Sequence, residues 1–302
     1  MNSTLPHLQH SSKSSCLAGI SPGSPKSLVS GICRTSVRQI PRGFTLVEIA
    51  IAIFIITILL GSILVPLTTQ VENRNFDNTQ RILDQAREAL LGYAAAYGYF
   101  PCPASTTSNG QEAAGTDHSI GAASTCPATV LGANTYIGFL PAARLGFTPV
   151  DANGYAVDAW GLTQNRIRYA VSNVTVNGIT QPFTRTNGMR NAGMANITGA
   201  ALLYVCNSGT GVVAGTNCGT AVTLASNAPG VIWSVGPNAA TTGGASVHEA
   251  QNPNPNGGSA DRLFVSRTKA AAGATGGEFD DIVTWIGTPT LFNRLIAAGQ
   301  LP

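Results

Sequence analysis

The stretch that decides the fold begins Arg42-Gly43-Phe44-Thr45-Leu46-Val47-Glu48-Ile49 and continues as an apolar run to Leu67. Residues 44–67 contain a single charged side chain, that of Glu48. Twelve of the seventeen residues in 49–65 are isoleucine, leucine, valine or phenylalanine. A helix of about 20 apolar residues crosses a hydrocarbon core of about 30 Å. The sequence therefore predicts a helix in which residues 44–67 span a membrane.

The charges on the two sides of this run are distributed unevenly. Residues 1–43 hold five lysines and arginines and no acidic residue, whereas residues 44–302 hold twelve basic and fourteen acidic residues. Since basic flanks stay on the cytoplasmic side, we expect residues 1–43 in the cytoplasm and the remainder exported. A secretory signal peptide is the alternative. It would have a shorter apolar core and an Ala-x-Ala cleavage site, which residues 65–70 fit poorly.

Glu48 is the unusual residue of the apolar run. A carboxylate in the middle of a membrane costs about 2.5–3.5 kcal/mol, so such a residue is a functional candidate; a position in the headgroup region is the alternative. The pattern Gly43-Phe44-Thr45-Leu46-Val47-Glu48 resembles the processing signal of the type IV pilin and pseudopilin family. The glycine, the aromatic residue after it, the glutamate and the following apolar run all coincide with that signal.

The resemblance implies roles for three residues. A membrane-bound prepilin peptidase would cleave after Gly43, remove residues 1–43 as a leader and methylate the new terminal amine of Phe44. Glu48 would pair with the Phe44 ammonium of a neighbouring subunit and set the axial register of a filament. In apolar surroundings either charge left alone is strongly unfavourable.

The leader is longer than is usual in this family, and its serine- and proline-rich start shows no periodicity. A translation start nearer Val29 or Val37 would leave a short basic leader of the usual kind. In that case residues 1–36 would not be made.

The resemblance also implies a setting and partners. We expect a single-pass protein of the bacterial inner membrane, with its globular domain in the periplasm or in an extracellular filament, and without a cofactor. The implied function is that of a structural subunit, a minor pilin or pseudopilin, of a type IV pilus or a type II secretion-like filament. The implied partners are other pilin or pseudopilin subunits, prepilin peptidase, the inner-membrane assembly platform and the lipid bilayer.

Two other functions remain open. One is a membrane-tethered adhesin or DNA-uptake pilin, which would bind a ligand through loops such as 207–219 and 236–260. The other is a single-span anchored enzyme. After the leader the only histidines are His118 and His248, and no convergent set of catalytic groups is recognisable, so we expect no enzymatic activity.

Nucleic-acid binding is not expected either. The net charge of residues 44–302 is −2, whereas nucleic-acid binding depends on basic surfaces that contact phosphates. Arg166 and Arg168 share one face of an expected strand, because side chains alternate along a strand. We expect them to form a solvent-facing pair.

Residues 68–100 predict an amphipathic continuation of the helix. Apolar residues recur every seven positions, which predicts one buried face. Gly98 predicts the end of the helix. The residues expected on the buried face are Phe76, Leu83, Leu90 and Tyr97.

Residues 101–302 predict a β-rich globular domain. Short runs of β-branched and aromatic residues alternate with glycine-rich stretches, as is typical of strands separated by turns. We expect an α+β, pilin-like fold in which an antiparallel sheet packs on the amphipathic half of the helix, with a short closing helix in 291–302. The expected strands are 166–176, 201–206, 221–225, 231–235, 262–266 and 281–286.

Four cysteines follow the leader, namely Cys102, Cys126, Cys206 and Cys218, and no C-x-x-C spacing occurs. In an exported chain four cysteines suggest two disulfides, for which three pairings are open. We favour Cys102–Cys126 and Cys206–Cys218, because each pair closes a short loop rich in glycine, threonine and asparagine.

We expect no bound metal. The candidates for calcium are the adjacent carboxylates Asp280 and Asp281, which precede a tryptophan-containing strand; some pseudopilins bind calcium through a C-terminal loop. Two adjacent carboxylates more often mark the solvated start of a strand, and calcium takes six to eight oxygen ligands.

Overall fold

The structure is a computed structural model. It describes residues 44–122, 125–127, 135–161, 163–213, 215–238, 246–252, 262–271 and 273–302, without the side chains of 62–68, 135 and 163. The predicted leader, including Gly43, and much of the loop 236–260 lie outside the described residues.

The chain divides into two compact units, residues 1–57 and 58–302. Helix α1 (Leu46–Tyr97) includes residues of both units. It ends at Gly98, which has a φ of 78° and whose N–H donates to the Ala94 carbonyl at 2.7 Å. A left-handed residue after a helix favours glycine, so the predicted helix end is confirmed.

The predicted membrane span, residues 44–67, largely forms the first part of α1. Its residues 62–67 are among those whose side chains are not described. In the part of the chain that the structure describes, no helix has both the length and the apolarity needed to cross a membrane.

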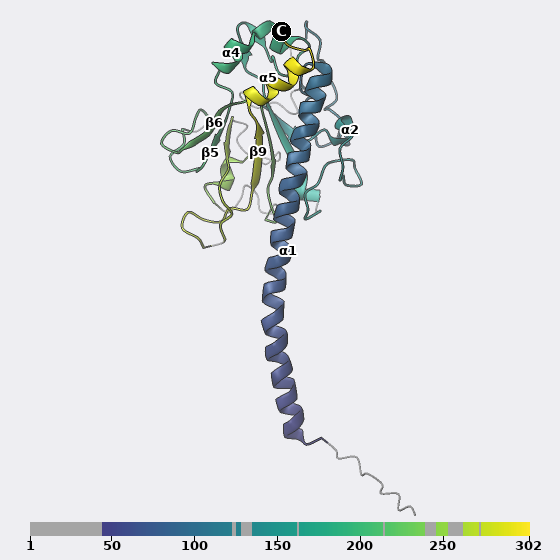
Figure 1. Cartoon of the computed structure of the whole chain (residues 1–302), viewed down its shortest axis with the longest axis vertical. Helices are drawn as coiled ribbons and strands as arrows, with labels where there is room; N and C mark the ends of the chain where they lie inside the picture. Colours follow the sequence, from purple (N-terminus) through teal and green to yellow (C-terminus); the bar gives the residue numbers. More distant parts are fainter. Residues whose placement is uncertain are drawn as a thin grey trace, which may run out of the picture. The chain divides into compact units, whose positions relative to one another are not determined.

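The main sheet of the second unit has four antiparallel strands in the order β1-β2-β7-β9. Figure 1 labels β9, the last strand of this order, and α5, the helix that follows it. Each strand has five residues, so the sheet is short and its core depends on what covers both faces. The strands are β1 (Thr135–Phe139), β2 (Arg168–Ser172), β7 (Gly230–Ser234) and β9 (Ile282–Ile286).

The two faces of the main sheet belong to different cores. Successive side chains of a strand point to opposite faces. On β2, Tyr169 and Val171 join the core that contains Leu83 and Leu90 of α1. Ala170, between them, joins a second core with residues such as Phe264. The main sheet therefore lies between α1 and another layer.

That other layer is a three-stranded sheet in the order β6-β5-β8. Strand β5 (Leu203–Cys206) pairs antiparallel with β6 (Thr223–Ala228) and parallel with β8 (Leu263–Val265). The expectation of one antiparallel sheet was therefore incomplete. A parallel pair needs a long connection, and the chain between β5 and β8 includes β6 and β7, which belong to different sheets.

The buried face of α1 is confirmed at Leu83 and Leu90, which are fully buried, and in part at Phe76, which packs against the core. The prediction is wrong at Tyr97, which is 50% exposed, and Ala94 is fully buried instead. A straight α-helix drifts by about 20° per heptad relative to a seven-residue repeat. Over the three heptads from Phe76 to Tyr97, this drift turns the predicted row of apolar residues away from the sheet.

The expected strand 166–176 is two strands, β2 and β3 (Thr175–Val176), and β3 forms a hairpin with β4 (Ile179–Thr180). The hairpin turns at Asn177-Gly178, where both φ values are positive, as in a type I′ turn. The closing helix α5 (Thr288–Ala297) begins earlier than expected. Within the described residues the other helices are α2 (Ala142–Leu145), η2 (Thr163–Asn165), α3 (Gly188–Ala192), α4 (Met194–Thr198) and η3 (Glu249–Gln251).

Candidate functional site

The first turn of α1 is closed by the side chains of Thr45 and Glu48. The Thr45 N–H donates to Glu48 Oε2 at 3.0 Å, and the Thr45 hydroxyl donates to the same oxygen at 3.1 Å. The Glu48 N–H donates to Thr45 Oγ1 at 3.2 Å. This reciprocal arrangement is a capping box, which satisfies N–H groups that no helical carbonyl can reach. The T-x-x-E spacing in the sequence could have predicted it.

The capping box uses only one carboxylate oxygen of Glu48. Both hydrogen bonds that the carboxylate accepts from described residues end on Oε2. The carboxylate lies at the exposed start of the helix, next to Phe44, which is 80% exposed. The cap therefore fixes the orientation of the carboxylate and leaves Oε1 able to accept a bond from a cation outside the helix.

The helix surface after this turn is apolar on every side. Ile53, Phe54, Ile55 and Ile56 are each at least 50% exposed, and four successive residues of an α-helix point around its whole circumference. A helix that is apolar all round is one that a large core or a membrane covers. The exposed large apolar residues of this stretch are Phe44, Leu46, Val47, Ile49, Ile51, Ile53, Phe54, Ile55, Ile56, Ile58, Leu59 and Leu60.

Both favoured cysteine pairs are disulfides in the structure. Cys102 is bonded to Cys126 and Cys206 to Cys218, with a Cα–Cα distance of 5.6 Å in each pair. The second bond closes the loop that follows β5, so it fixes one end of the second sheet.

Asp280 and Asp281 meet a third carboxylate, that of Glu249. One oxygen of each residue lies within 4.8 Å of the others, and the three residues are 3%, 5% and 2% exposed, respectively. The expectation of a solvated strand start is therefore wrong. Sequence reasoning missed Glu249, because it belongs to η3 and reaches Asp280 only through the fold; the Asp280 N–H donates to Glu249 Oε1 at 3.0 Å.

Burial dominates the electrostatics of this carboxylate group. Burial, together with the charges of Glu249 and Glu278, raises the pKa of Asp280 to about 7. Burial also raises the pKa of Asp281 well above its usual value, although the Asn252 amide donates to its Oδ2 at 2.7 Å. Oδ1 of Asp280 has no hydrogen-bond partner.

These three carboxylates are residues that could hold a metal ion, because calcium and magnesium prefer oxygen ligands. Three donors are fewer than the six to eight oxygens that calcium takes. The raised pKa of Asp280 offers another way to neutralise the group, namely protonation. The calcium prediction for Asp280 and Asp281 therefore stays a prediction.

A second group, formed by Cys102, Glu112 and His118, is unsuited to metal binding because Cys102 is in a disulfide. His118 Nε2 contacts Glu112 Oε1 at 2.8 Å, and Nδ1 contacts the Thr184 carbonyl at 2.6 Å. Both ring nitrogens contact oxygen atoms, so the imidazole ties the loop of Glu112 to that of Thr184.

The other histidine, His248, has different surroundings. Its Nδ1 accepts the Gly209 N–H at 2.9 Å, and burial lowers its pKa. Neither this bond nor the contacts of His118 involve a serine or cysteine side chain.

Arg166 and Arg168 are not a solvent-facing pair. Arg168 is 3% exposed. Arg166 donates to Asp151 Oδ2 at 2.7 Å, and its guanidinium lies 3.9 Å from the ring centroid of Tyr155. The expectation was wrong because both faces of β2 are covered, one by α1 and the other by the second sheet.

Comparison with known proteins supports the N-terminal site. Residues 40–64 match the family model of the prokaryotic N-terminal methylation motif, the prepilin-type signal of type IV pilins and pseudopilins. Neither the curated proteins nor the solved structures contain a match to the chain. The motif supports a type IV pilin-like or pseudopilin-like protein, and the signal implies processing and assembly with other pilin subunits.

Proposed function

We propose that this protein is a structural subunit, a minor pilin or pseudopilin, of a type IV pilus or a type II secretion-like filament. The single observation that carries the proposal is the start of α1. There a capped glutamate stands at the head of a helix that is apolar on all sides, inside the matched methylation motif.

Before assembly, the apolar stretch holds the subunit in the inner membrane. The twelve large aliphatic and aromatic residues of 49–65 contribute roughly −4 to −7 kcal/mol to insertion, at about −0.3 to −0.6 kcal/mol each. This exceeds the cost of about 2.5–3.5 kcal/mol for a carboxylate such as that of Glu48. The globular domain is then on the periplasmic side, opposite the basic leader.

Processing after Gly43 creates the partner for Glu48. Phe44 gains a terminal ammonium, and Glu48 lies about 6 Å further along the helix axis, at 1.5 Å per residue. Thr45 keeps its N–H after cleavage, so the capping box survives. Oε2 stays with the cap while Oε1 accepts the ammonium of a neighbouring subunit. A subunit in the wrong register would leave both charges unpaired among apolar side chains, which is strongly unfavourable.

The size of the chain favours a minor subunit. About 200 residues follow α1, and that bulk would crowd a filament made of one repeated subunit. No enzymatic activity is part of the proposal.

The test replaces Glu48 without removing the cap. Glutamine also serves at this position of a capping box, so Glu48→Gln keeps the helix start and removes only the charge. We expect normal processing and membrane insertion, but at least a tenfold loss from the filament fraction that is sheared from cells and pelleted. Asp77→Asn, which removes an exposed charge from the same helix, should assemble like the wild type.

A cap variant separates the two roles of the glutamate. Thr45→Val removes the hydroxyl of the cap and keeps the Glu48 charge, so it should assemble far better than Glu48→Gln. Wild-type assembly of Glu48→Gln would refute the ion pair. Equal failure of both variants would assign the role to the cap instead.

A further inference from the structure

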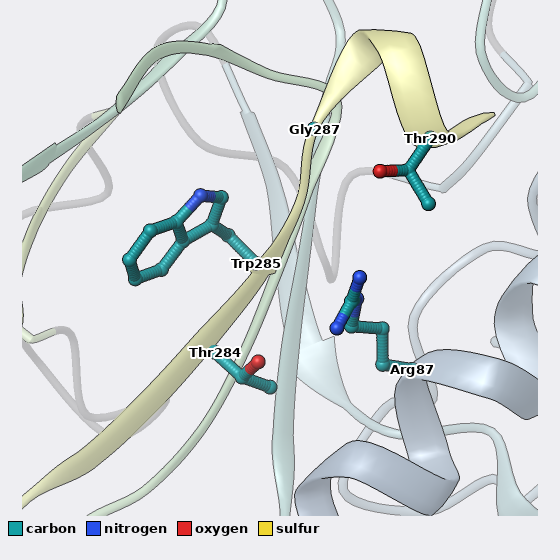
Figure 2. A pocket seen from close by; sticks show the side chains of 5 residues that line it. All are labelled: Arg87, Thr284, Trp285, Gly287 and Thr290. Atoms are coloured by element: carbon teal, nitrogen blue, oxygen red, sulfur yellow. The ribbon is translucent and has the colours of Figure 1, made fainter. Parts of the chain in front are cut away.

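Arg87 of α1 turns its guanidinium into a pocket of about 300 Å³ beside the end of β9 and the start of α5 (Figure 2). The pocket is lined by Arg87, Thr284, Trp285, Gly287 and Thr290. Thr284 and Thr290 direct their hydroxyls toward the space beside Arg87, whereas the indole of Trp285 lies on the opposite side of β9. The side chains that face the pocket therefore offer only a cation and two hydroxyls.

Arg87 has no counter-ion within the described part of the chain. Its Nε is buried and makes no hydrogen bond. The next residue, Glu88, pairs instead with Arg294 of α5 at 2.6 Å. A buried polar atom that lacks a hydrogen-bond partner is costly, and the described part of the chain leaves Arg87 Nε without an acceptor.

The start of α5 adds positive potential to the same pocket. The N-cap residue, Gly287, makes no side-chain cap, and the first turn holds no acidic residue. The first N–H groups of a helix have no helical partner and carry partial positive charge; in α5 these are the N–H groups of Thr288 and Thr290, because Pro289 has none. In the same turn the Thr288 hydroxyl is buried, at 1% exposed, and has no hydrogen-bond partner. The Arg87 guanidinium and the start of α5 thus both bring positive charge to the pocket, and none of the lining residues is a carboxylate.

We propose that this pocket binds a small oxyanion, a phosphate or carboxylate group. Such a group accepts two parallel bonds from the planar guanidinium, and it also accepts from the Thr290 hydroxyl and the first turn of α5. The Thr284 hydroxyl bounds the opposite wall. A volume of about 300 Å³ admits an anion with a small organic body.

The assembly proposal does not depend on this pocket. The pocket residues are Arg87 and side chains between 284 and 290, whereas assembly rests on Phe44, Thr45 and Glu48. Failure of either proposal would leave the other unaffected.

The test is calorimetric titration of the full chain in detergent with inorganic phosphate and, separately, with succinate, at matched ionic strength. We expect saturable binding of at least one anion and at least a tenfold loss of affinity in Arg87→Gln. Arg81→Gln, which changes an exposed arginine of the same helix outside the pocket, should bind like the wild type. Preference for phosphate or for succinate identifies which oxyanion source the pocket suits.

Three outcomes would overturn the proposal. They are the absence of binding by both anions, equal affinity in Arg87→Gln and the wild type, and equal loss in Arg81→Gln and Arg87→Gln. Thr290→Val keeps every charge and should weaken binding at least threefold. Unchanged affinity in that variant would place the anion outside the pocket.

Discussion

At the scale of single residues, we propose that the two carboxylate oxygens of Glu48 have different tasks. Oε2 closes the first turn of α1 with Thr45, while Oε1 remains for a partner beyond the helix. The sequence motif predicts an assembly role for Glu48, whereas the cap was missed, although the T-x-x-E spacing contains it. Motif and cap are both local in sequence, so both could be derived before any fold was known.

The buried carboxyl of Asp280 should make the free energy of unfolding depend on pH. Its pKa of about 7 exceeds the unfolded value of about 3.9, so the native state binds the proton more tightly. The stabilisation that the protonated Asp280 gives the folded state is fully present below pH 4 and is lost as the pH rises through about 7. Between pH 5 and 7.5 the free energy of unfolding should fall by a few kcal/mol, since each pKa unit corresponds to about 1.4 kcal/mol.

Asp280→Asn should reduce this pH dependence, because the amide cannot ionise, whereas Asp281, whose pKa burial also raises, still titrates. Urea unfolding of the full chain in detergent measures the free energy of unfolding at about pH 5 and about pH 7.5. A chelator is present to exclude divalent cations. Asp77→Asn, which replaces an exposed carboxylate, should retain the full dependence. Identical pH profiles for Asp280→Asn and the wild type would show that Asp280 does not titrate in this range.

At the scale of elements, the second half of α1 derives its stability from packing on the main sheet. Leu90→Ala should lower the free energy of unfolding by about 2–5 kcal/mol, because it leaves a cavity beside a fully buried site. Val71→Ala truncates an exposed apolar side chain of the same helix and should change stability by about 0.5 kcal/mol or less.

Tryptophan fluorescence during urea unfolding reports both variants, because Trp233 is buried in the core on the far side of the main sheet. Similar costs for Leu90→Ala and Val71→Ala would mean that α1 does not pack as described.

Most strands of the two larger sheets were predictable from short runs of β-branched, aromatic and other apolar residues, whereas β1 was not. Its sequence, TYIGF, lies in a stretch rich in glycine, alanine and threonine, and its pairing with β2 supplies the order that local propensity lacks. Helices α3 and α4 were missed for a related reason, since glycine and asparagine are poor helix formers. The parallel pairing of β8 with β5 depends on chain topology, which no local pattern contains.

At the scale of the whole molecule, local and non-local sites differ in how far sequence predicts them. The start of α1 lies within eight consecutive residues and could be identified directly. The carboxylate group joins Glu249 to Asp280 and Asp281, and the pocket joins Arg87 to residues about 200 positions later. The sequence singled out Asp280 and Asp281 as neighbours, but it could not place Glu249 or the pocket residues beside their partners, because the fold alone brings them together.

The central claim is that the chain is processed at the glycine before the apolar helix and then works as a membrane-held filament subunit. Mass spectrometry of the mature amino terminus, on protein isolated from the membrane and filament fractions of cells, tests it most directly. We expect a chain that begins at Phe44 with a methylated amine. An intact leader, or a terminus created by cleavage near Leu67, would contradict it.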